Sequence, residues 1–152
     1  RYSVYFLRKK MKFLIFGLLA FFAISIEAKY DFSETAKNCL TEIKSDEDTV
    51  RGILEEDKLF PEDNELAVKF FECMYHTNIN DDNEMIVDDK MKHRVTEILT
   101  DRLDGKEKLA ALIADDCLEH CKDRKGDSKG KTAIKVVNCI RERTWEYMKT
   151  KN

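Results

Sequence analysis

The sequence is poor in the two residues that interrupt helices, since its 152 positions include one proline and five glycines. Apolar side chains recur at spacings of three and four residues rather than two, which is the period of a helix and not of a strand. The pattern therefore predicts an all-α fold of about six helices joined by short polar turns, with no internal repeat and no low-complexity tract.

A block of basic side chains is also missing from residues 29–152, which carry 22 basic and 29 acidic side chains and a net charge of −7. Nucleic acids and anionic membrane surfaces both bind clustered positive charge. The acidic balance therefore disfavours both of these partners, and it favours solubility.

Scarce glycine leaves no loop that could serve as an oxyanion site, which a catalytic cysteine and histidine pair would need. Cys117 and His120 stand close together, but nothing around them completes such a site. The stretch is also similar to the histidine-bearing helix of secreted phospholipases A2. However, Cys121 follows His120 where those enzymes have aspartate, and no glycine-rich calcium loop precedes it. We therefore expect no catalytic residue, no cofactor and no enzymatic activity.

One long apolar run interrupts this polar composition, and it lies near the start of the chain. Residues 11–28 combine a basic residue, Lys12, with a 14-residue apolar core at 13–26 and small residues after it. This arrangement is typical of a secretory signal peptide, and the core is short for a membrane span. Cleavage is expected after Ser25 or after Ala28.

The chain is therefore predicted to have three parts. Residues 1–10 are interpreted as translated upstream sequence or a non-native extension, residues 11–28 as the signal peptide, and residues 29–152 as a secreted helical domain. The alternative is an uncleaved anchor whose basic residues around Lys9 hold the cytoplasmic side. After signal cleavage we expect an extracellular protein with no stable membrane insertion.

The positions of the individual helices follow from the apolar period and from capping residues. Ser45 and Asn64 are suitable N-caps for the second and third helices, and Pro61 prevents the second from continuing. The third helix is apolar nearly all round, so we expect it to lie centrally. The expected helices span about 32–43, 45–57, 65–78, 88–103, 106–122 and 131–150.

The five cysteines, an odd number, all fall within residues 29–152. Disulfides are the default state of cysteines in an exported chain. A zinc site is the competing interpretation, because Cys117, His120 and Cys121 share one helical face at i, i+3 and i+4. Cys139 would then have to supply the fourth ligand. Bridging is favoured over zinc, so we expect no bound metal.

The turn at 78–89 mimics a calcium loop, with oxygen-bearing side chains at alternate positions. Asn83 stands where the sharp turn of such a loop needs glycine, and Asp89 replaces its bidentate glutamate. A solvated turn between two helices is therefore favoured. His76 and His93 each stand alone, and ligand release at low pH through either of them is a further hypothesis.

The cysteine spacing resembles that of the insect odorant-binding protein family, which includes pheromone-binding and general odorant-binding proteins. Members have a secreted six-helix fold around an apolar pocket and usually carry six cysteines. The stretch "KFFECMYHTNINDDNE" resembles the third-helix segment and makes Cys73 the third cysteine. The stretch "CKDRKGDSKGKTAIKVVNC" resembles the closing segment, with Cys121 as the fourth cysteine and Cys139 as the sixth. Cys39 matches the first.

Two cysteines of the family pattern are missing from this sequence. Lys69 stands at the second position and Gly130 at the fifth, and in the family these two cysteines are bonded to each other. The chain therefore resembles the Minus-C, or four-cysteine, subgroup, which lacks one whole bridge. Its loss is expected to loosen the third helix relative to the sixth.

The resemblance implies the disulfides Cys39–Cys73 and Cys121–Cys139. Loops of this length stabilise a fold by about 3–4 kcal/mol each. Cys117 has no counterpart in the family. We expect it to be a buried free thiol, with covalent dimerisation as the alternative if it is exposed.

The resemblance further implies a reversible, non-catalytic carrier for small hydrophobic ligands, such as odorants, pheromones or lipids. An odorant receptor in the membrane would be a further partner, and the expected assembly is a monomer or weak dimer. About half of the expected wall residues would pack helix on helix, since spacing does not separate wall from core. The expected wall comprises Leu54, Phe70, Met74, Met91, Val95, Ile98, Leu112, Ile113, Val136 and Ile140, with Trp145 or Tyr147 near the C-terminal closure.

The competing function belongs to a different class. A secreted helical interaction or structural protein of a gland or of the haemolymph would keep the same fold and bind no small ligand. Binding of a fluorescent apolar probe would discriminate the two functions.

Overall fold

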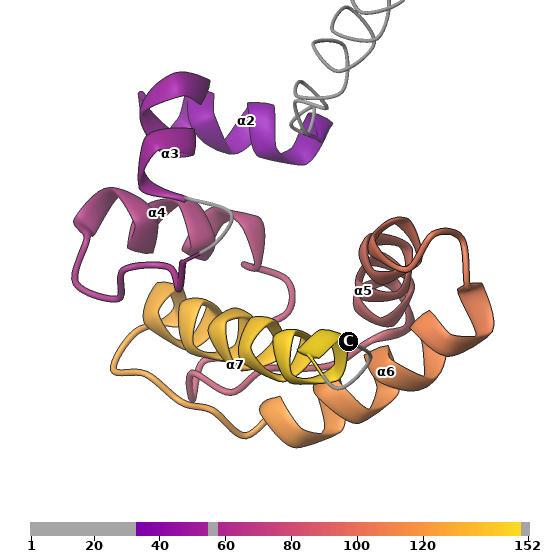
Figure 1. The fold of residues 1–152 in the computed structure, drawn as a ribbon. Coiled ribbons are helices and arrows are strands. Elements are labelled where there is room, and N and C mark those ends of the chain that lie inside the picture. The colour runs from indigo at the N-terminus through magenta and orange to yellow at the C-terminus, as the bar shows by residue number, and fades with distance from the viewer. Residues whose placement is uncertain (1–32, 55–57, 150–152) are drawn as a thin grey trace, which may run out of the picture. The chain divides into compact units, whose positions relative to one another are not determined.

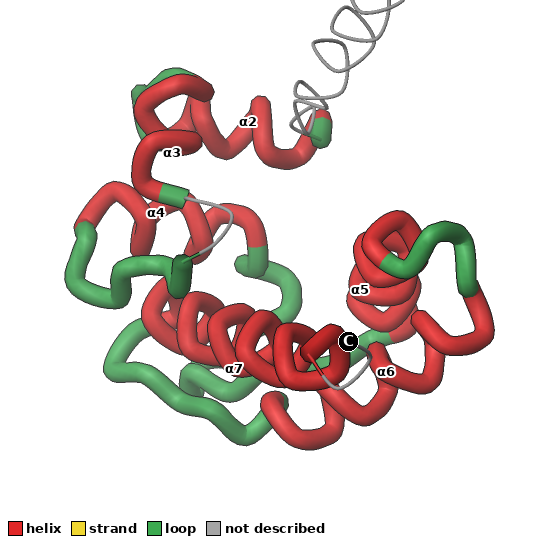
Figure 2. Tube along the Cα trace, viewed as in Figure 1, coloured by secondary structure: helices red, strands yellow, loops and turns green. Residues whose placement is uncertain are grey.

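The computed structural model describes residues 33–54 and 58–149. The described part contains six α-helices (Figure 1), which confirms the predicted all-α class: α2 (Glu34–Glu42), α3 (Glu47–Ile53), α4 (Glu65–Met74), α5 (Asp89–Arg102), α6 (Glu107–Cys121) and α7 (Lys129–Lys149). Loops and turns join them (Figure 2). The predicted extension at 1–10 and the predicted signal peptide at 11–28 lie outside the described residues. None of the described helices has the length and apolar character needed to cross a membrane.

Short polar side chains begin several of these helices. Asp46, Asn64 and Asp88 each accept the backbone N–H three residues further on, at 2.8, 3.0 and 2.8 Å. Each bond satisfies a donor that the first turn of a helix leaves without an intrahelical partner. The expected cap Asn64 is therefore correct, whereas the expected cap Ser45 is one residue early. Asp46 takes its place because its carboxylate reaches the exposed N–H groups of the first turn.

The order in which the helices pack differs from their order in the chain. α4 packs against α2, α3 and α7, while α6 packs against α5 and α7 (Figure 1). The expected central position of α4 is therefore shared with α7, which packs against both α4 and α6. The buried residues of α7 are Gly130, Thr132, Ala133, Ile134, Val136, Asn138, Cys139 and Thr144.

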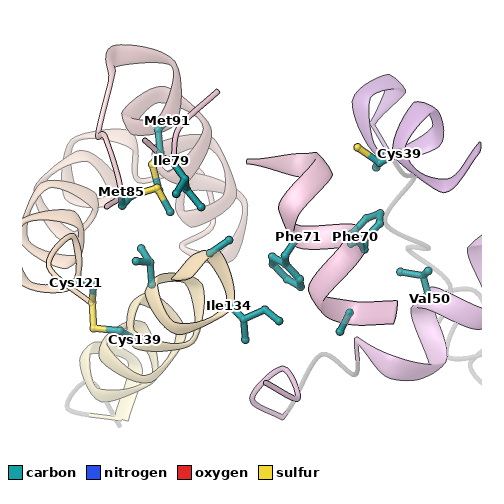
Figure 3. Packing of buried hydrophobic residues seen from close by; sticks show 14 of the residues in the cluster. Cys39, Val50, Phe70, Phe71, Ile79, Met85, Met91, Cys121, Ile134 and Cys139 are labelled. Carbon is teal, nitrogen blue, oxygen red and sulfur yellow. A yellow bond between two sulfur atoms is a disulfide. The ribbon is translucent and has the colours of Figure 1, made fainter. Parts of the chain in front are cut away.

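Buried apolar side chains form two clusters. The second cluster lies between α5 and α6, and it consists of Leu99, Ala110, Ile113, Ala114 and Cys117. The first cluster is larger and draws on every described helix and on the turn at 79–85 (Figure 3): Ala36, Cys39, Leu40, Val50, Ala67, Phe70, Phe71, Ile79, Met85, Met91, Leu118, Cys121, Ala133, Ile134, Val136 and Cys139.

Two disulfides connect the helices, and both match the pairing implied by the family resemblance. Cys39–Cys73 joins α2 to α4. Cys121–Cys139, drawn in Figure 3, joins α6 to α7. The Cα–Cα distance is 5.7 Å in each, which is ordinary for bonded cysteines. Cys117 is free and buried.

The two positions that lack a family cysteine have different surroundings. A Cβ at Gly130 would overlap the carbonyl oxygen of Val68 and lie 2.7 Å from its Cγ1, so α7 lies directly on the backbone of α4. Only glycine permits this approach, because any side chain would meet that backbone. Lys69 is exposed and its Nζ lies 2.6 Å from Oε1 of Glu65. Close helix packing therefore accompanies the absence of the third bridge.

Candidate ligand-binding site

The expected wall residues divide into three groups by burial. Ile98 and Leu112 are 40% and 70% exposed and face the exterior. The buried members, which pack inside the two clusters, are Phe70, Met91, Ile113 and Val136. The half-buried members, which keep some accessible surface, are Leu54, Met74, Val95, Ile140, Trp145 and Tyr147.

Two of the half-buried wall residues contact both clusters. Val95 of α5 and Ile140 of α7 each pack against both clusters. Met74 and Tyr75, at the end of α4, pack against the first cluster. We call these four residues the apolar junction. They come from three different helices, and none of them is fully buried.

Aromatic rings extend from the loop before α4 to the end of that helix. The ring centroids of Phe60 and Phe71 lie 5.0 Å apart, and Phe70 meets Phe71 edge-on at 6.0 Å. Tyr75 stacks on Phe71 with an interplanar angle of 3° and a centroid distance of 6.1 Å. In Figure 3, Phe71 points toward Ile134 of α7. Such rings provide rigid apolar surface beside the junction.

A polar clamp holds the loop before α4 on α7. Asn138 donates from Nδ2 to the carbonyl of Phe60 at 2.9 Å and accepts its N–H at Oδ1 at 2.8 Å. Arg141 donates to the carbonyl of Lys58 at 2.9 Å, and its guanidinium lies 4.3 Å from the centroid of the Phe60 ring. Asn138 was not expected from the sequence to have this role. A polar residue within the apolar stretch "KVVNC" was the signal that could have indicated it.

The two residues expected near the C-terminal closure have different partners. The ring centroid of Trp145 lies 5.4 Å from the guanidinium carbon of Arg141, a residue of the polar clamp. Tyr147 packs against the second cluster and donates its hydroxyl to Oδ2 of Asp116 at 2.8 Å. Positions two apart on a helix point in nearly opposite directions, so the two side chains lie on different sides of α7.

Asp116 links α6 to α7 through an ion pair. Arg143 donates from Nε to Oδ2 at 2.6 Å and from Nη2 to Oδ1 at 3.2 Å. The hydrogen bond from Arg143, followed by that from Tyr147, lowers the pKa of the Asp116 carboxyl. This group therefore carries a negative charge at neutral pH and fixes the end of α7 on α6.

The surroundings of Cys117 suit a structural thiol. Its Sγ lies 4.0 Å from the hydroxyl oxygen of Thr144. Burial raises the pKa of Cys117, which keeps the thiol protonated and poorly nucleophilic at neutral pH. His120 is exposed, whereas Cys117 is fully buried. The helix therefore places this cysteine and histidine in different environments.

The zinc and calcium interpretations meet specific obstacles in the structure. Cys121 and Cys139 are bonded to each other, so neither can serve as a thiolate ligand. In the turn, Asn80 Oδ1 already accepts the N–H groups of Asp82 and Glu84, at 3.0 and 2.8 Å. Within residues 33–54 and 58–149, no group of three or more acidic, histidine or cysteine side chains is placed to hold a metal ion.

Six helices, two disulfides and a half-buried apolar junction define the class of small, disulfide-bonded helical proteins. The sequence matches the PBP/GOBP family, the insect odorant-binding family, over residues 23–143, and the chain belongs to that family. Members of this family are binding proteins for small hydrophobic ligands and not enzymes. No curated protein and no solved structure matches the chain.

Proposed function

We propose that this protein is a secreted, non-catalytic carrier that binds small hydrophobic ligands reversibly at the apolar junction, and that it belongs to the Minus-C type. One observation carries the proposal. Val95 and Ile140 contact both buried clusters and yet stay only half-buried. Apolar surface that lies among core residues without being covered by them is suited to an apolar ligand.

The energetics of such a site match a shuttle. Each buried methylene contributes about 0.8 kcal/mol, so about ten of them supply roughly 8 kcal/mol, which corresponds to about micromolar affinity. Ordering of the ligand and the wall reduces this value. Met74 adds a flexible and polarisable surface that adapts to ligands of different shape.

Secretion is part of the same proposal. Two disulfides persist in oxidising compartments and are rare in the cytosol. The predicted signal peptide at 11–28 would direct the chain there. In an olfactory role, the carrier would deliver its ligand to an odorant receptor in the membrane, and it would act as a monomer or weak dimer.

The proposal is tested with the full chain expressed and exported from cultured insect cells. Its N-terminal residue reports whether cleavage follows Ser25 or Ala28. A neutral fluorescent probe, N-phenyl-1-naphthylamine, should bind stoichiometrically and be displaced by long-chain alcohols and esters. Val95→Trp, which fills the junction, should weaken binding of the probe about tenfold or more.

The matched control for this variant is Leu112→Trp, because Leu112 is the exposed member of the expected wall at 70%. It should bind the probe as the unmodified protein does. Absence of probe binding to the folded, correctly bridged protein would contradict the carrier function. That result would favour the secreted interaction or structural protein instead.

A further inference from the structure

We infer that the two disulfides differ in their susceptibility to reduction: thiols attack the Cys39–Cys73 bridge first, at Cys73 Sγ, and the carboxylate of Glu42 slows that attack. The bridge is then a redox-sensitive attachment of α2 to α4, and one negative charge controls the rate at which it is lost. The inference does not depend on the proposed carrier function.

The four bridged cysteines differ in accessibility. Cys121 and Cys139 are 0% and 8% exposed, so both ends of the bridge between α6 and α7 are buried. Cys39 is also buried, at 2%, whereas its partner Cys73 near the end of α4 is half-buried. A thiolate must reach a sulfur atom in order to displace its partner, so access decides which bridge is reduced. Cys73 is therefore the expected point of attack.

Glu42 indicates that the sulfur of Cys73 itself lies at the surface. This exposed residue ends α2, and its Oε2 lies 3.4 Å from Cys73 Sγ. A bridged sulfur carries no hydrogen and donates no hydrogen bond, so the carboxylate stands beside the bridge without being bound to it. A reagent that approaches this sulfur from the solvent therefore meets the charge of Glu42.

The other charged side chains nearby on α4 and after it have different partners. Lys69, one turn before Cys73 on the same face of the helix, has its Nζ 2.6 Å from Oε1 of Glu65. His76, one turn after Cys73, has its Nδ1 2.8 Å from the carbonyl oxygen of Cys73, so its ring lies against the backbone. The group in contact with the sulfur is the carboxylate of Glu42, which repels an incoming thiolate.

The reaction is a thiol–disulfide exchange with a dithiol as the reductant. One thiolate of the dithiol forms a bond to Cys73 Sγ, and the sulfur–sulfur bond breaks with its electron pair on Cys39 Sγ, which takes up a proton from water. The second thiolate of the dithiol then displaces Cys73, which leaves as a thiolate and is protonated in turn. The protein gains two thiols, and the dithiol becomes a cyclic disulfide.

Reduction at this bridge would act on α2 in particular. The buried residues of α2 are Ala36, Cys39 and Leu40, so few apolar contacts hold it once the bridge is open. Cys121–Cys139 continues to join α6 to α7. After selective reduction, the amides of α2 should exchange with solvent faster, while those of α6 and α7 keep their protection.

The order of reduction is measured on the exported, folded protein by treatment with dithiothreitol, alkylation of the released thiols and peptide mapping. Cys39 and Cys73 should be alkylated about tenfold faster than Cys121 and Cys139. Glu42→Gln should accelerate reduction of the Cys39–Cys73 bridge about fivefold, because it removes the repulsion between two unit charges about 4 Å apart in water.

The charge of the reductant provides a second measurement. Glu42→Gln should accelerate attack by 2-mercaptoethanesulfonate, which is anionic, more than attack by cysteamine, whose ammonium group is attracted to the carboxylate. A purely structural effect of the substitution would change both rates by the same factor, and that result would contradict the electrostatic role of Glu42.

Glu34→Gln is the matched control, because it removes an exposed carboxylate from the first turn of the same helix. It should leave the rate of reduction unchanged. If opening of α2 limited the rate, the control would be accelerated instead, since a negative charge stabilises the N-terminus of a helix and destabilises its C-terminus. That result, an unchanged rate in Glu42→Gln, or reduction of Cys121–Cys139 as fast as Cys39–Cys73 would overturn the inference.

Discussion

The two buried clusters of this protein are stabilised in different ways. All four bridged cysteines lie in the first cluster or pack against it, whereas the second cluster contains only the free cysteine Cys117. The second cluster depends on the close packing of α5 and α6 around Ala110 and Ala114, which are both fully buried. Neither disulfide involves α5. We therefore expect α5 to open at lower free energy than α2 and α4.

This difference bears on ligand exchange. The apolar junction joins the bridged part of the fold, through Met74 and Tyr75, to the part without a bridge, through Val95 of α5. In the proposed carrier, a ligand would enter by movement of α5 while the disulfides hold α2 on α4 and α6 on α7. The experiments below either separate the two clusters or show that they act as one unit.

The largest effect is expected from the first cluster. Replacing Cys39 and Cys73 together by alanine should lower the free energy of unfolding by about 4 kcal/mol, because the bridge spans a separation of 34 residues. Removing the pair Cys121 and Cys139, with a separation of 18, should cost about 3 kcal/mol. Urea unfolding of the two variants measures both values. Equal or reversed losses would contradict the dependence on loop length.

In the second cluster, Ile113→Ala should lower the free energy of unfolding by about 3 kcal/mol, because it leaves a cavity between α5 and α6. Alkylation of Cys117 in the native protein should accelerate in the same variant, since the thiol becomes reachable when this cluster opens. Leu112→Ala is the matched control, because Leu112 is 70% exposed and its neighbour Ile113 only 4%. Stability in the control should change by less than about 0.5 kcal/mol. If removal of the Cys39–Cys73 bridge accelerated alkylation of Cys117 as much as Ile113→Ala does, the two clusters would open as one cooperative unit.

The contact between α4 and α7 gives a smaller effect. Gly130→Ala should cost about 2 kcal/mol, because the added methyl group meets the backbone of Val68. Gly52→Ala is the control, since no atom lies within 4 Å of a Cβ built at this helical glycine. It should stabilise the protein by about 0.5 kcal/mol. Thermal unfolding measures the stability of the two variants. If Gly130→Ala were as stable as the unmodified protein, α4 and α7 would separate easily.

The smallest effect is expected at the ion pair that links α6 to α7. Arg143 and Tyr147 hold the pKa of Asp116 below its usual value of 3.8, so its contribution to stability is present above that value. The contribution is lost as the pH falls through the lower pKa of the folded state. Asp116→Asn should therefore cost about 0.5 kcal/mol at pH 7, in keeping with the partial exposure of the pair, and less in acid. Urea unfolding at pH 7 and at acidic pH measures the loss, with the exposed Asp82→Asn as the control. A loss that grew on acidification would contradict this prediction.

Much of the fold could be predicted because its signals are local. The cap at Asn64 depends on residues within one turn of it. α3 ends at Ile53, earlier than the end predicted from Pro61. The disulfides became predictable when the cysteine spacing was compared with a family pattern, since five cysteines alone allow many pairings. Ser45 failed as a cap by one position because Asp46, next to it, offers a charged acceptor to the same turn.

The site could be predicted only in part. Ile113 and Leu112 are neighbours on a helix whose apolar residues occupy more than one face, so periodicity assigned both to the wall. In the structure Ile113 is buried and Leu112 is exposed. The residues of the apolar junction come from helices far apart in the chain, and no short stretch of sequence contains that information.

The sequence by itself determined the six helices and, through its cysteine spacing and the family resemblance, the two bridges, because these depend on local backbone chemistry and a fixed spacing. The tertiary structure alone decided which apolar residues keep surface for a ligand, and that Gly130 lies on the backbone of Val68. It also decided that Asn138 holds a loop 78 positions away in the chain. These features arise from packing between distant segments, and the free energy of such contacts depends on all the helices that meet there.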